Sequence, residues 1–420
     1  MALIKTPVTG MRDILPAEMA LRGYVIGLIR STYEGFGYTP IETPVVESLG
    51  NLLSKQGGDN EKLIFKILKR GEKLKIDTAK TEEDLSDSGL RYDLTVPLVR
   101  YYAAHANELP KPFKSLQIGP VFRADRPQRG RFRQFYQCDI DILGEPEADA
   151  EIDLILATTT LLGKLGFEGF TLHINDRRIL KAMAAGCGFA EAEYDKVFII
   201  LDKMDKIGSE GVLRELCEAG FAPEQAASYL QLFAALQQAD SPLDELALRL
   251  GKDSEAVIRN LQHIIRSVES VAETPFLLKF DPTLVRGMSY YTGPIFEIEL
   301  AGLGCAAGGG GRYDEMVGKF TNLKVPACGL SLGFERLITI LTEQGFTIPE
   351  EAPKTAFLTE KNLSAGQMAA VRRRAAERRR EGRRVLVTVM NKNKKFQKDQ
   401  LQSQGYGEIV EFYRDRTPEE

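Results

Sequence analysis

The sequence predicts an α+β fold, in which an antiparallel sheet is flanked by helices, a mainly helical insertion interrupts the strands, and a small α/β domain follows at the C-terminal end. Three observations support this prediction. Strand-like patterns occur in two blocks, at about residues 89–144 and 276–300. A long stretch rich in Ala, Leu and Glu separates them at about residues 176–270. A polar connector with prolines then precedes the last unit, around residues 346–357.

The length of the chain indicates more than one domain. With 420 residues, the chain exceeds the size at which a single hydrophobic core usually divides. We expect a large domain over residues 1–345, interrupted by the helical insertion at about 176–270. A short α/β domain is expected over residues 354–420.

The composition excludes several classes of protein. The formal net charge is -4, so the chain as a whole is not a basic nucleic-acid-binding protein, and any such contact must come from local patches. The five cysteines are scattered and form no CxxC pair, and the three histidines do not cluster, which predicts a reducing compartment without disulfides or structural zinc. No apolar run approaches the roughly 20 residues of a membrane span, and the N-terminus lacks the apolar segment of a signal peptide. We therefore expect a soluble, cytoplasmic protein.

Periodicity and chain breakers predict the individual elements. Apolar residues at helical spacing indicate a helix over about residues 19–36, which ends at two glycines before the strand-like segment YTPIETPVVES. Period-two patterns indicate strands from Gly89 to Gly144. A helix at about residues 148–165 and the strand FTLHIN precede the insertion, and FLLKFDPTLVRGMSYYTGPIFEIEL returns to strand character after it.

The segment FRADRPQRGRFRQFYQCDIDILG predicts a long hairpin with a cationic tip. The first strand delivers Arg123 at its end, and Pro127 and Gly130 mark the turn. In the second strand, which we expect to begin at Arg131, alternate side chains point to opposite faces. One face is polar and the other mostly apolar; the polar face carries Arg131, Arg133, Gln137, Asp139 and Asp141. The charge pattern alone also fits a solvated edge hairpin.

A second polar pair lies in LRYDLTVPLVRYY, which we predict as a strand. Alternation would put Arg91, Asp93 and Thr95 on one face. A carboxylate and a hydroxyl two residues apart on a sheet could hold an ammonium group. Taken alone, the pair also fits ordinary surface polarity of a strand.

Arginines and glycines in apolar surroundings form the third group of candidates. Arg286 lies in a largely apolar strand pattern and needs a partner, because an unpaired buried guanidinium is costly. Simple alternation would put Arg286 and Tyr291 on opposite faces, so a bulge or break near Gly287 is required if both contact one ligand. The glycines at 308–311 let the backbone approach a flat or anionic group, although such runs also form ordinary turns. Arg336, in ACGLSLGFERLITIL, fits either a phosphate contact or a solvated side chain.

These segments resemble the motifs of a known enzyme family. The hairpin RPQRGRFRQFYQCDID with Arg123 resembles motif 2 of class II aminoacyl-tRNA synthetases, GLSLGFERL resembles motif 3, and PIETPVVES resembles the end of motif 1, the dimer-forming element. LVRGMSYYTG and GGGRYD resemble the two histidine-specific signatures of the histidyl-tRNA synthetase family, and LRYDLTVP resembles its substrate-binding strand. The resemblance runs from Gly10 to about Leu341, and the signature around Arg286 narrows it to the histidyl family.

The resemblance implies a class II catalytic core that acts as a histidine–tRNA ligase. Such an enzyme activates histidine with ATP and Mg²⁺ to histidyl-adenylate and transfers the histidyl group to tRNA(His). The histidine carboxylate that attacks the α-phosphorus is already an anion, so the reaction needs orientation and charge stabilisation rather than a strong base. Arginine forks suit both carboxylate and phosphate groups.

The resemblance also implies roles for individual residues. Arg123 and Arg286 are the expected catalytic residues: Arg123 binds the α-phosphate, and Arg286 bridges this phosphate and the histidine carboxylate. Arg336 is expected to hold the far end of a bent ATP, and Arg131 is a further ATP contact. Besides Arg286, the expected histidine contacts are Asp93, Thr95 and Gln137 at the α-amino group, Asp141 and Tyr291 at the ring nitrogens, and Tyr290 and Tyr313 in the pocket wall. No side chain is assigned to a metal, and Ser289 stands where the family usually has aspartate.

The tRNA is expected to contact both ends of the chain. At the hairpin tip, Gln128, Arg129 and Arg133 would approach the acceptor end. The basic segments VRRRAAERRREGRR and NKNKKFQK resemble an anticodon-binding domain, and Glu377 and Glu381 are too few to pair these arginines. The resemblance further implies a homodimer.

A catalytically silent paralogue is the alternative. The regulatory subunit of ATP phosphoribosyltransferase uses the same fold as a histidine sensor bound to a partner enzyme. Such a sensor could keep Asp93, Gln137 and Tyr291, but it needs neither Arg123 and Arg336 nor a cationic hairpin tip. Because the chain has all of these, the ligase is the favoured function.

Overall fold

The computed structural model describes residues 3–53, 58–286, 290–349 and 351–416. The chain divides into two units, of which the first contains Met1–Ile14 with Arg22–Gly345 and the second contains Leu15–Leu21 with Phe346–Glu420. Within the described ranges, no helix is long and apolar enough to cross a membrane.

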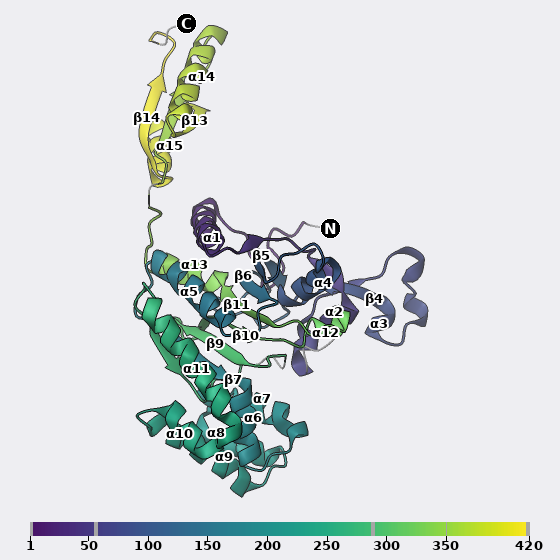
Figure 1. Cartoon of the computed structure of the whole chain (residues 1–420). Helices are drawn as coiled ribbons and strands as arrows, with labels where there is room; N and C mark the ends of the chain where they lie inside the picture. Colours follow the sequence, from purple (N-terminus) through teal and green to yellow (C-terminus); the bar gives the residue numbers. More distant parts are fainter. Residues whose placement is uncertain (1–2, 54–57, 287–289, 350, 417–420) are drawn as a thin grey trace. The chain divides into compact units, whose positions relative to one another are not determined.

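A sheet of eight strands lies at the centre of the first unit, in the order β1-β5-β6-β11-β10-β9-β7-β8 (Figure 1). The inner pairs, from β5 to β7, are antiparallel, whereas the outer pairs β1–β5 and β7–β8 are parallel. The predicted α+β class is therefore confirmed, and both edges of the antiparallel sheet carry a parallel strand. The strands are β1 (Thr39–Pro40), β5 (Phe113–Phe122), β6 (Gln134–Leu143), β7 (Thr171–Asp176), β8 (Leu277–Phe280), β9 (Pro294–Glu299), β10 (Ala306–Arg312) and β11 (Ala327–Gly333).

Helices pack on this sheet and bury the apolar face of β6. Helix α5 contacts β6 and β11, and α13 contacts β6. The side chains of Cys138, Ile140 and Ile142, which alternation predicted on one face of the hairpin strand, are buried. The helices of this region are α4 (Thr95–His105), α5 (Asp149–Lys164), α12 (Gly318–Thr321), α13 (Phe334–Glu343) and, from Arg22 onward, α1 (Pro16–Gly35).

The segment LRYDLTVPLVRYY is helical from Thr95 onward and only Leu90 belongs to a strand, so its prediction as one strand is wrong. The Asp93 carboxylate accepts a hydrogen bond from the Val96 N–H at 3.1 Å and so satisfies a donor at the start of α4. Pro97 lies in the first turn, where a missing N–H costs no intrahelical bond. The buried residues fit helical rather than strand spacing: Val96, Pro97, Leu98, Val99 and Tyr102.

A smaller antiparallel sheet, in the order β2-β4-β3, lies between β1 and α4 in the sequence. Its core consists of buried side chains of Leu49, Leu52, Ile64 and Tyr92. The elements are β2 (Val46–Ser48), α2 (Leu49–Leu53), η1 (Gly58–Leu63), β3 (Lys66–Leu68), η2 (Gly71–Lys73), η3 (Ile76–Thr78), α3 (Glu82–Leu85) and β4 (Ser86–Leu90).

A cluster of helices is inserted between β7 and β8, which are neighbours in the sheet. The helices gather beside β7 (Figure 1). They are α6 (Arg177–Gly186), η4 (Glu191–Glu193), α7 (Tyr194–Leu201), α8 (Met204–Glu218), α9 (Pro223–Gln238), α10 (Pro242–Leu250) and α11 (Lys252–Val271).

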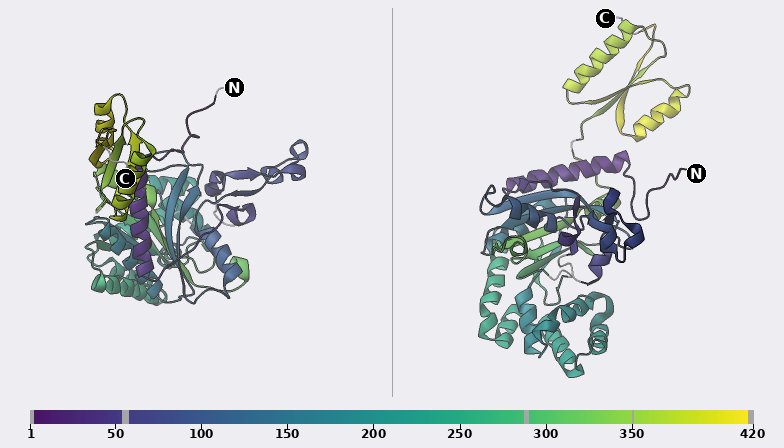
Figure 2. Two further views of the ribbon diagram at one scale, coloured as in Figure 1. Left: turned by 90° about the horizontal axis from the view of Figure 1, so that it is seen from above. Right: turned by 90° about the vertical axis from the view of Figure 1, so that its right-hand side faces the viewer.

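The second unit is a small α/β fold with a parallel sheet in the order β13-β12-β14. Helix α14 covers one face through Val371 and Ala375, and α15 covers the other through Leu401 (Figure 2). The elements are β12 (Lys354–Thr359), α14 (Ala365–Arg380), β13 (Arg384–Val389), α15 (Lys394–Ser403) and β14 (Tyr406–Phe412).

Candidate active site

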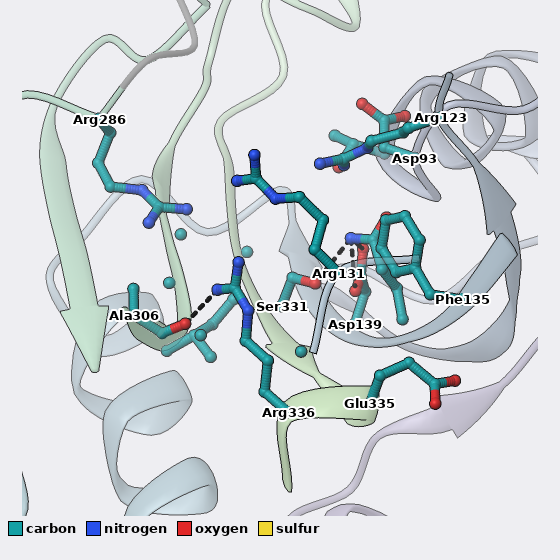
Figure 3. Close-up of a pocket in the computed structure, with 18 of the residues that line it drawn as sticks. Asp93, Arg123, Arg131, Phe135, Asp139, Arg286, Ala306, Ser331, Glu335 and Arg336 are labelled. Carbon is teal, nitrogen blue, oxygen red and sulfur yellow. Dashed lines mark hydrogen bonds between the residues drawn. The ribbon is translucent and has the colours of Figure 1, made fainter. Parts of the chain in front are cut away.

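A pocket of about 200 Å³ in the first unit gathers the predicted catalytic, nucleotide and amino-acid contacts (Figure 3). The loop after β5, the polar face of β6, the glycine strand β10 and the start of α13 form its walls. The predicted residues that line it are Asp93, Thr95, Arg123, Arg131, Gln137, Asp141, Arg286, Tyr290, Tyr291, Tyr313 and Arg336.

Four arginines from three segments reach the pocket, and Figure 3 shows them on several sides of it. Arg123 is held in place, because its Nε donates to the Tyr92 carbonyl at 3.0 Å and its guanidinium lies 4.2 Å from the centre of the Tyr92 ring. Burial lowers the pKa of Arg336, and the guanidinium groups of Arg131, Arg286 and Arg123 lower it further. So much positive charge around one pocket suits a ligand with several negative charges.

The polar face of β6 supplies the opposite charge. Gln137, Asp139 and Asp141 all line the pocket and are buried, as the predicted alternation requires. Burial raises the pKa of Asp139 well above its usual value, and the neighbouring Asp141 raises it further. Because β6 begins at Gln134, the predicted strand start at Arg131 is three residues too early, and Arg131 belongs to the turn.

Asp141 is the most precisely held of these carboxylates. Its Oδ1 accepts a hydrogen bond from the Tyr313 hydroxyl at 2.6 Å. Burial raises the pKa of Asp141 to about 7, against the lowering effect of the Tyr313 hydrogen bond. The same burial, together with Asp141, raises the pKa of the Tyr313 hydroxyl well above its usual value, so Tyr313 remains a hydrogen-bond donor.

Three buried polar atoms at the pocket have no hydrogen-bond partner in the part of the chain that the structure describes: Gln137 Oε1, Asp141 Oδ2 and Arg286 Nε. The rest of each side chain is anchored. Gln137 Nε2 donates to Ser331 Oγ at 2.8 Å, and Arg286 Nη1 donates to Glu297 Oε2 at 2.7 Å. Buried polar atoms are almost always paired, so two free acceptors and one free donor around one pocket indicate a polar ligand.

The glycines of β10 and β11 let these side chains lie against the sheet. A Cβ on Gly309 would come within 2.7 Å of Arg286 Nη1, and a Cβ on Gly329 within 1.8 Å of Asp141 Oδ1. A Cβ on Gly310 would lie 1.9 Å from the Gly329 carbonyl oxygen. The glycine run therefore forms a strand rather than a turn, and its approach to a flat or anionic ligand stays a prediction.

Arg286 lies outside the strands, so its predicted strand context is wrong. Strand β8 ends at Phe280 and β9 begins at Pro294. Arg286 and Tyr291 could face one ligand only if the chain left regular strand geometry between them. This departure is found at Arg286 itself, whose backbone is left-handed with φ of 58°. Gly287 and Ser289 lie outside the described residues.

Of the hairpin tip, Arg131 reaches the pocket, whereas the predicted tRNA contacts lie outside it. Arg129 forms an ion pair with Glu343, and Arg133 donates to the carbonyls of Asp125 and Thr9 at 3.1 and 3.3 Å. The backbones of Gln128 and Arg131 pair with each other across the turn. Gln128, Arg129 and Arg133 do not line the pocket.

Sequence analysis missed the buried ion pairs that support the pocket. Glu335, in the first turn of α13, accepts from both Nη atoms of Arg22 at 2.6 and 2.8 Å and from the backbone N–H of Tyr136 at 3.3 Å. Arg312, next to Tyr313, forms two bonds of 2.6 Å with the Glu151 carboxylate. A charged residue in an apolar stretch signals that a partner exists, but its position in the sequence does not identify the partner.

Arg91 is also structural. Its guanidinium donates to the Thr43 carbonyl at 2.7 Å and to the Pro120 carbonyl at 2.8 Å. Arg91 therefore ties β5 to the segment after β1 and does not line the pocket with Asp93 and Thr95, although strand alternation had placed the three on one face.

The basic C-terminal segment has more acidic partners than its own sequence suggested. Glu408 lies 2.7 Å from Arg383 and 3.8 Å from Arg378, and Glu351 lies 3.0 Å from Arg384. The expectation that too few acids pair these arginines is therefore wrong in part, because the partners come from β14 and from the connector. Other arginines of α14 remain exposed: Arg372, Arg373, Arg374, Arg379 and Arg380.

The sequence is similar to those of known proteins over most of the chain. A family model described as Histidyl-tRNA synthetase matches residues 10–337. The histidine–tRNA ligase of Leifsonia xyli subsp. xyli is 44% identical over 96% of this chain and 94% of the relative, and that of Christiangramia forsetii is 39% identical over 80% and 76%.

Solved structures show the same architecture. The crystal structure of histidyl-tRNA synthetase from Nostoc sp. PCC 7120 matches with a TM-score of 0.77 and 28% identity, over 99% of this chain and 93% of that chain. An ATP phosphoribosyltransferase regulatory subunit/histidyl-tRNA synthetase from Bacillus halodurans C matches with a TM-score of 0.78 over 98% and 99%. Its identity is 21%, so this second match concerns the fold alone.

Proposed function

Because the chain belongs to the histidyl-tRNA synthetase family, we propose that it is a histidine–tRNA ligase, which activates histidine with ATP and transfers the histidyl group to tRNA(His). The family that the motifs predicted is thereby confirmed. The observation that carries the proposal is one pocket in which four guanidinium groups face buried carboxylates, with three polar atoms left to pair with a ligand.

Histidine would lie on the acidic side of this pocket. Asp141 Oδ2 would accept a hydrogen bond from one ring nitrogen, and Tyr313 would hold the carboxylate in place through Oδ1. Tyr291 would contact the second ring nitrogen. Gln137 Oε1, with Asp93 and Thr95, would accept the ammonium group, and Tyr290 would close the wall. A side chain of similar size without these ring nitrogens would leave Asp141 unpaired, which is a strong basis for rejection.

ATP would lie on the cationic side. Arg123 would bind the α-phosphate, and Arg286 would bridge it and the histidine carboxylate, so that the attacking oxygen and the phosphorus are held together. Arg131 and Arg336 would bind the remaining phosphates. The chain thus contributes orientation and positive charge where negative charge develops, and it needs no general base. Mg²⁺ bound to the phosphates would supply further neutralisation, since it is held mainly by substrate phosphates in sites of this kind.

The tRNA contacts, the dimer and the compartment are also proposals. We propose that Gln128, Arg129 and Arg133 contact the acceptor end and that the exposed arginines of α14 contact a more distant part of the tRNA. Two copies are proposed to form a homodimer through the motif 1 region, where the apolar side chain of Val46 is 47% exposed. The enzyme is proposed to act in the cytoplasm.

Histidine-dependent exchange between ATP and pyrophosphate tests the proposal, because it reports adenylate formation without tRNA. We expect the wild-type chain to catalyse the exchange with Mg²⁺ and Arg286→Ala to abolish it while histidine binding is largely kept. If the wild type binds histidine but shows no exchange, the ligase function is wrong and a histidine sensor is indicated instead.

A further inference from the structure

The backbone that carries Arg286 is held from the first residues of the helical insertion. Residues 281–286 follow β8 and are called the Arg286 loop below. The β7–α6 junction, Asn175 to Arg177, lies beside this loop and is buried. Its contacts with the loop run almost entirely to backbone carbonyls, so they constrain the path of the chain.

Asn175 provides the strongest of these contacts. Its Nδ2 donates to the Pro282 carbonyl at 3.2 Å and to the Leu284 carbonyl at 2.9 Å. Its Oδ1 accepts from the backbone N–H of Asp176 at 2.8 Å, which fixes the orientation of the amide. Asn175 is fully buried, and both the nitrogen and the oxygen of its side-chain amide are used in these bonds.

Arg177 extends the same contact to the next carbonyl and links it to the insertion. Its Nη1 donates to the Val285 carbonyl at 3.4 Å, directly before Arg286. The same guanidinium lies 4.6 Å from the centre of the Phe198 ring and 3.5 Å from Asp195 Oδ1, both on α7. Arg177 therefore connects a helix of the insertion to the residue that precedes Arg286.

Arg286 needs such support. A left-handed backbone is unfavourable for a residue with a Cβ and persists where the surroundings over-determine it. At the other end of the side chain, the guanidinium is held by Glu297 and lies against Gly309, so a shift of the backbone would disturb these contacts.

We propose that Asn175 and Arg177 are positioning residues for Arg286: they hold the carbonyls of residues 282, 284 and 285, fix the left-handed backbone of Arg286 and so place its guanidinium in the pocket. This inference rests on the proposed function. It also makes the start of the helical insertion part of the catalytic apparatus, since a displacement of α7 would be transmitted through Arg177 to the backbone before Arg286.

The test is histidine-dependent ATP–pyrophosphate exchange by the full chain carrying N175A or R177M. We expect kcat to fall about 10- to 100-fold while KM for histidine stays within about threefold, because a misplaced Arg286 loses contacts of the transition state more than of the ground state. K181A is the matched control: Lys181 lies on α6 and its side chain is exposed, so kcat should stay near the wild-type value.

A double-mutant cycle separates positioning from a loss of packing. In the weakly active background Arg286→Lys, N175A should lower the exchange rate little further, because its effect runs through Arg286. If N175A lowers the exchange rate by the same factor in the wild-type and in the Arg286→Lys background, or leaves kcat unchanged in the wild-type background, the inference is overturned. If N175A does not fold, R177M decides the question in the same cycle, since its side chain can still pack on Phe198. Failure of the wild type to catalyse exchange would instead contradict the proposed function.

Discussion

The substitution Asp141→Asn tests how the buried Asp141 carboxyl group changes the free energy of unfolding with pH. Burial raises the pKa of Asp141 from 3.8 to about 7, so the folded protein keeps a proton that the unfolded chain loses between these values. The buried, protonated Asp141 therefore contributes to the free energy of unfolding. This contribution is fully present below about pH 4 and is lost as the pH rises through the folded pKa of about 7. With about 1.4 kcal/mol per pH unit for one proton, the contribution lost between pH 5 and pH 7 is about 2 kcal/mol.

The assay is urea unfolding of the large unit without ligands at pH 5 and pH 7. The wild type should lose about 2 kcal/mol more of its free energy of unfolding over this interval than D141N does. D399N, at an exposed carboxylate of α15, is the control and should retain the full pH dependence. Because the comparison uses the change with pH, a constant cost of burying the asparagine amide cancels.

Histidine binding gives the second measurement on the same variant. A hydrogen bond to a buried charged group contributes about 1.5–3 kcal/mol, so D141N should weaken histidine binding about 10- to 150-fold in calorimetric titration. Parallel pH dependence of the wild type and D141N would refute the reasoning about the buried carboxylate. Unchanged histidine affinity would refute the placement of the ring at Asp141.

Three further predictions follow from the same structure. Gly309→Ala should lower kcat of ATP–pyrophosphate exchange about 100-fold, since the added Cβ would lie 2.7 Å from Arg286 Nη1. Gly407→Ala, where a Cβ meets nothing within 4 Å, is the control, and equal rates of the two variants would contradict the prediction. Arg312→Met should lower the free energy of unfolding by about 3–5 kcal/mol, because it leaves the Glu151 carboxylate buried without its partner; an unchanged urea midpoint would exclude this. Charge reversal of the exposed Arg372 and Arg373 should raise KM for tRNA in aminoacylation assays without affecting exchange, and an unaltered KM would rule out tRNA contact by this face of α14.

The sequence predicted the parts of the site that depend on local pattern. A strand alternates with a period of two wherever it lies, so the common face of Gln137, Asp139 and Asp141 followed from spacing alone. The turn at Pro127 and Gly130 and the family both followed from short contiguous motifs.

Local pattern failed where two structures compete for the same residues. The segment from Arg91 to Tyr102 is rich in β-branched and aromatic residues, which favour a strand. A helix nevertheless begins at Thr95, because Asp93 accepts from the Val96 N–H and Pro97 fits the first turn. The apolar residues around Arg286 likewise suggested a continuous strand, whereas the chain there leaves the sheet.

Only the tertiary structure decided which distant residues meet. The pairs Arg312–Glu151 and Arg22–Glu335 join segments more than 150 residues apart, and no spacing rule relates them. Spacing also does not predict the hydrogen bond from Tyr313 to Asp141 or the one from Asn175 to the Leu284 carbonyl of the Arg286 loop. Sequence by itself determined which side chains were candidates for the site, because strand period and motif are local properties. Their partners, burial and pKa values were decided by packing, because desolvation and hydrogen bonding depend on every segment that surrounds a group.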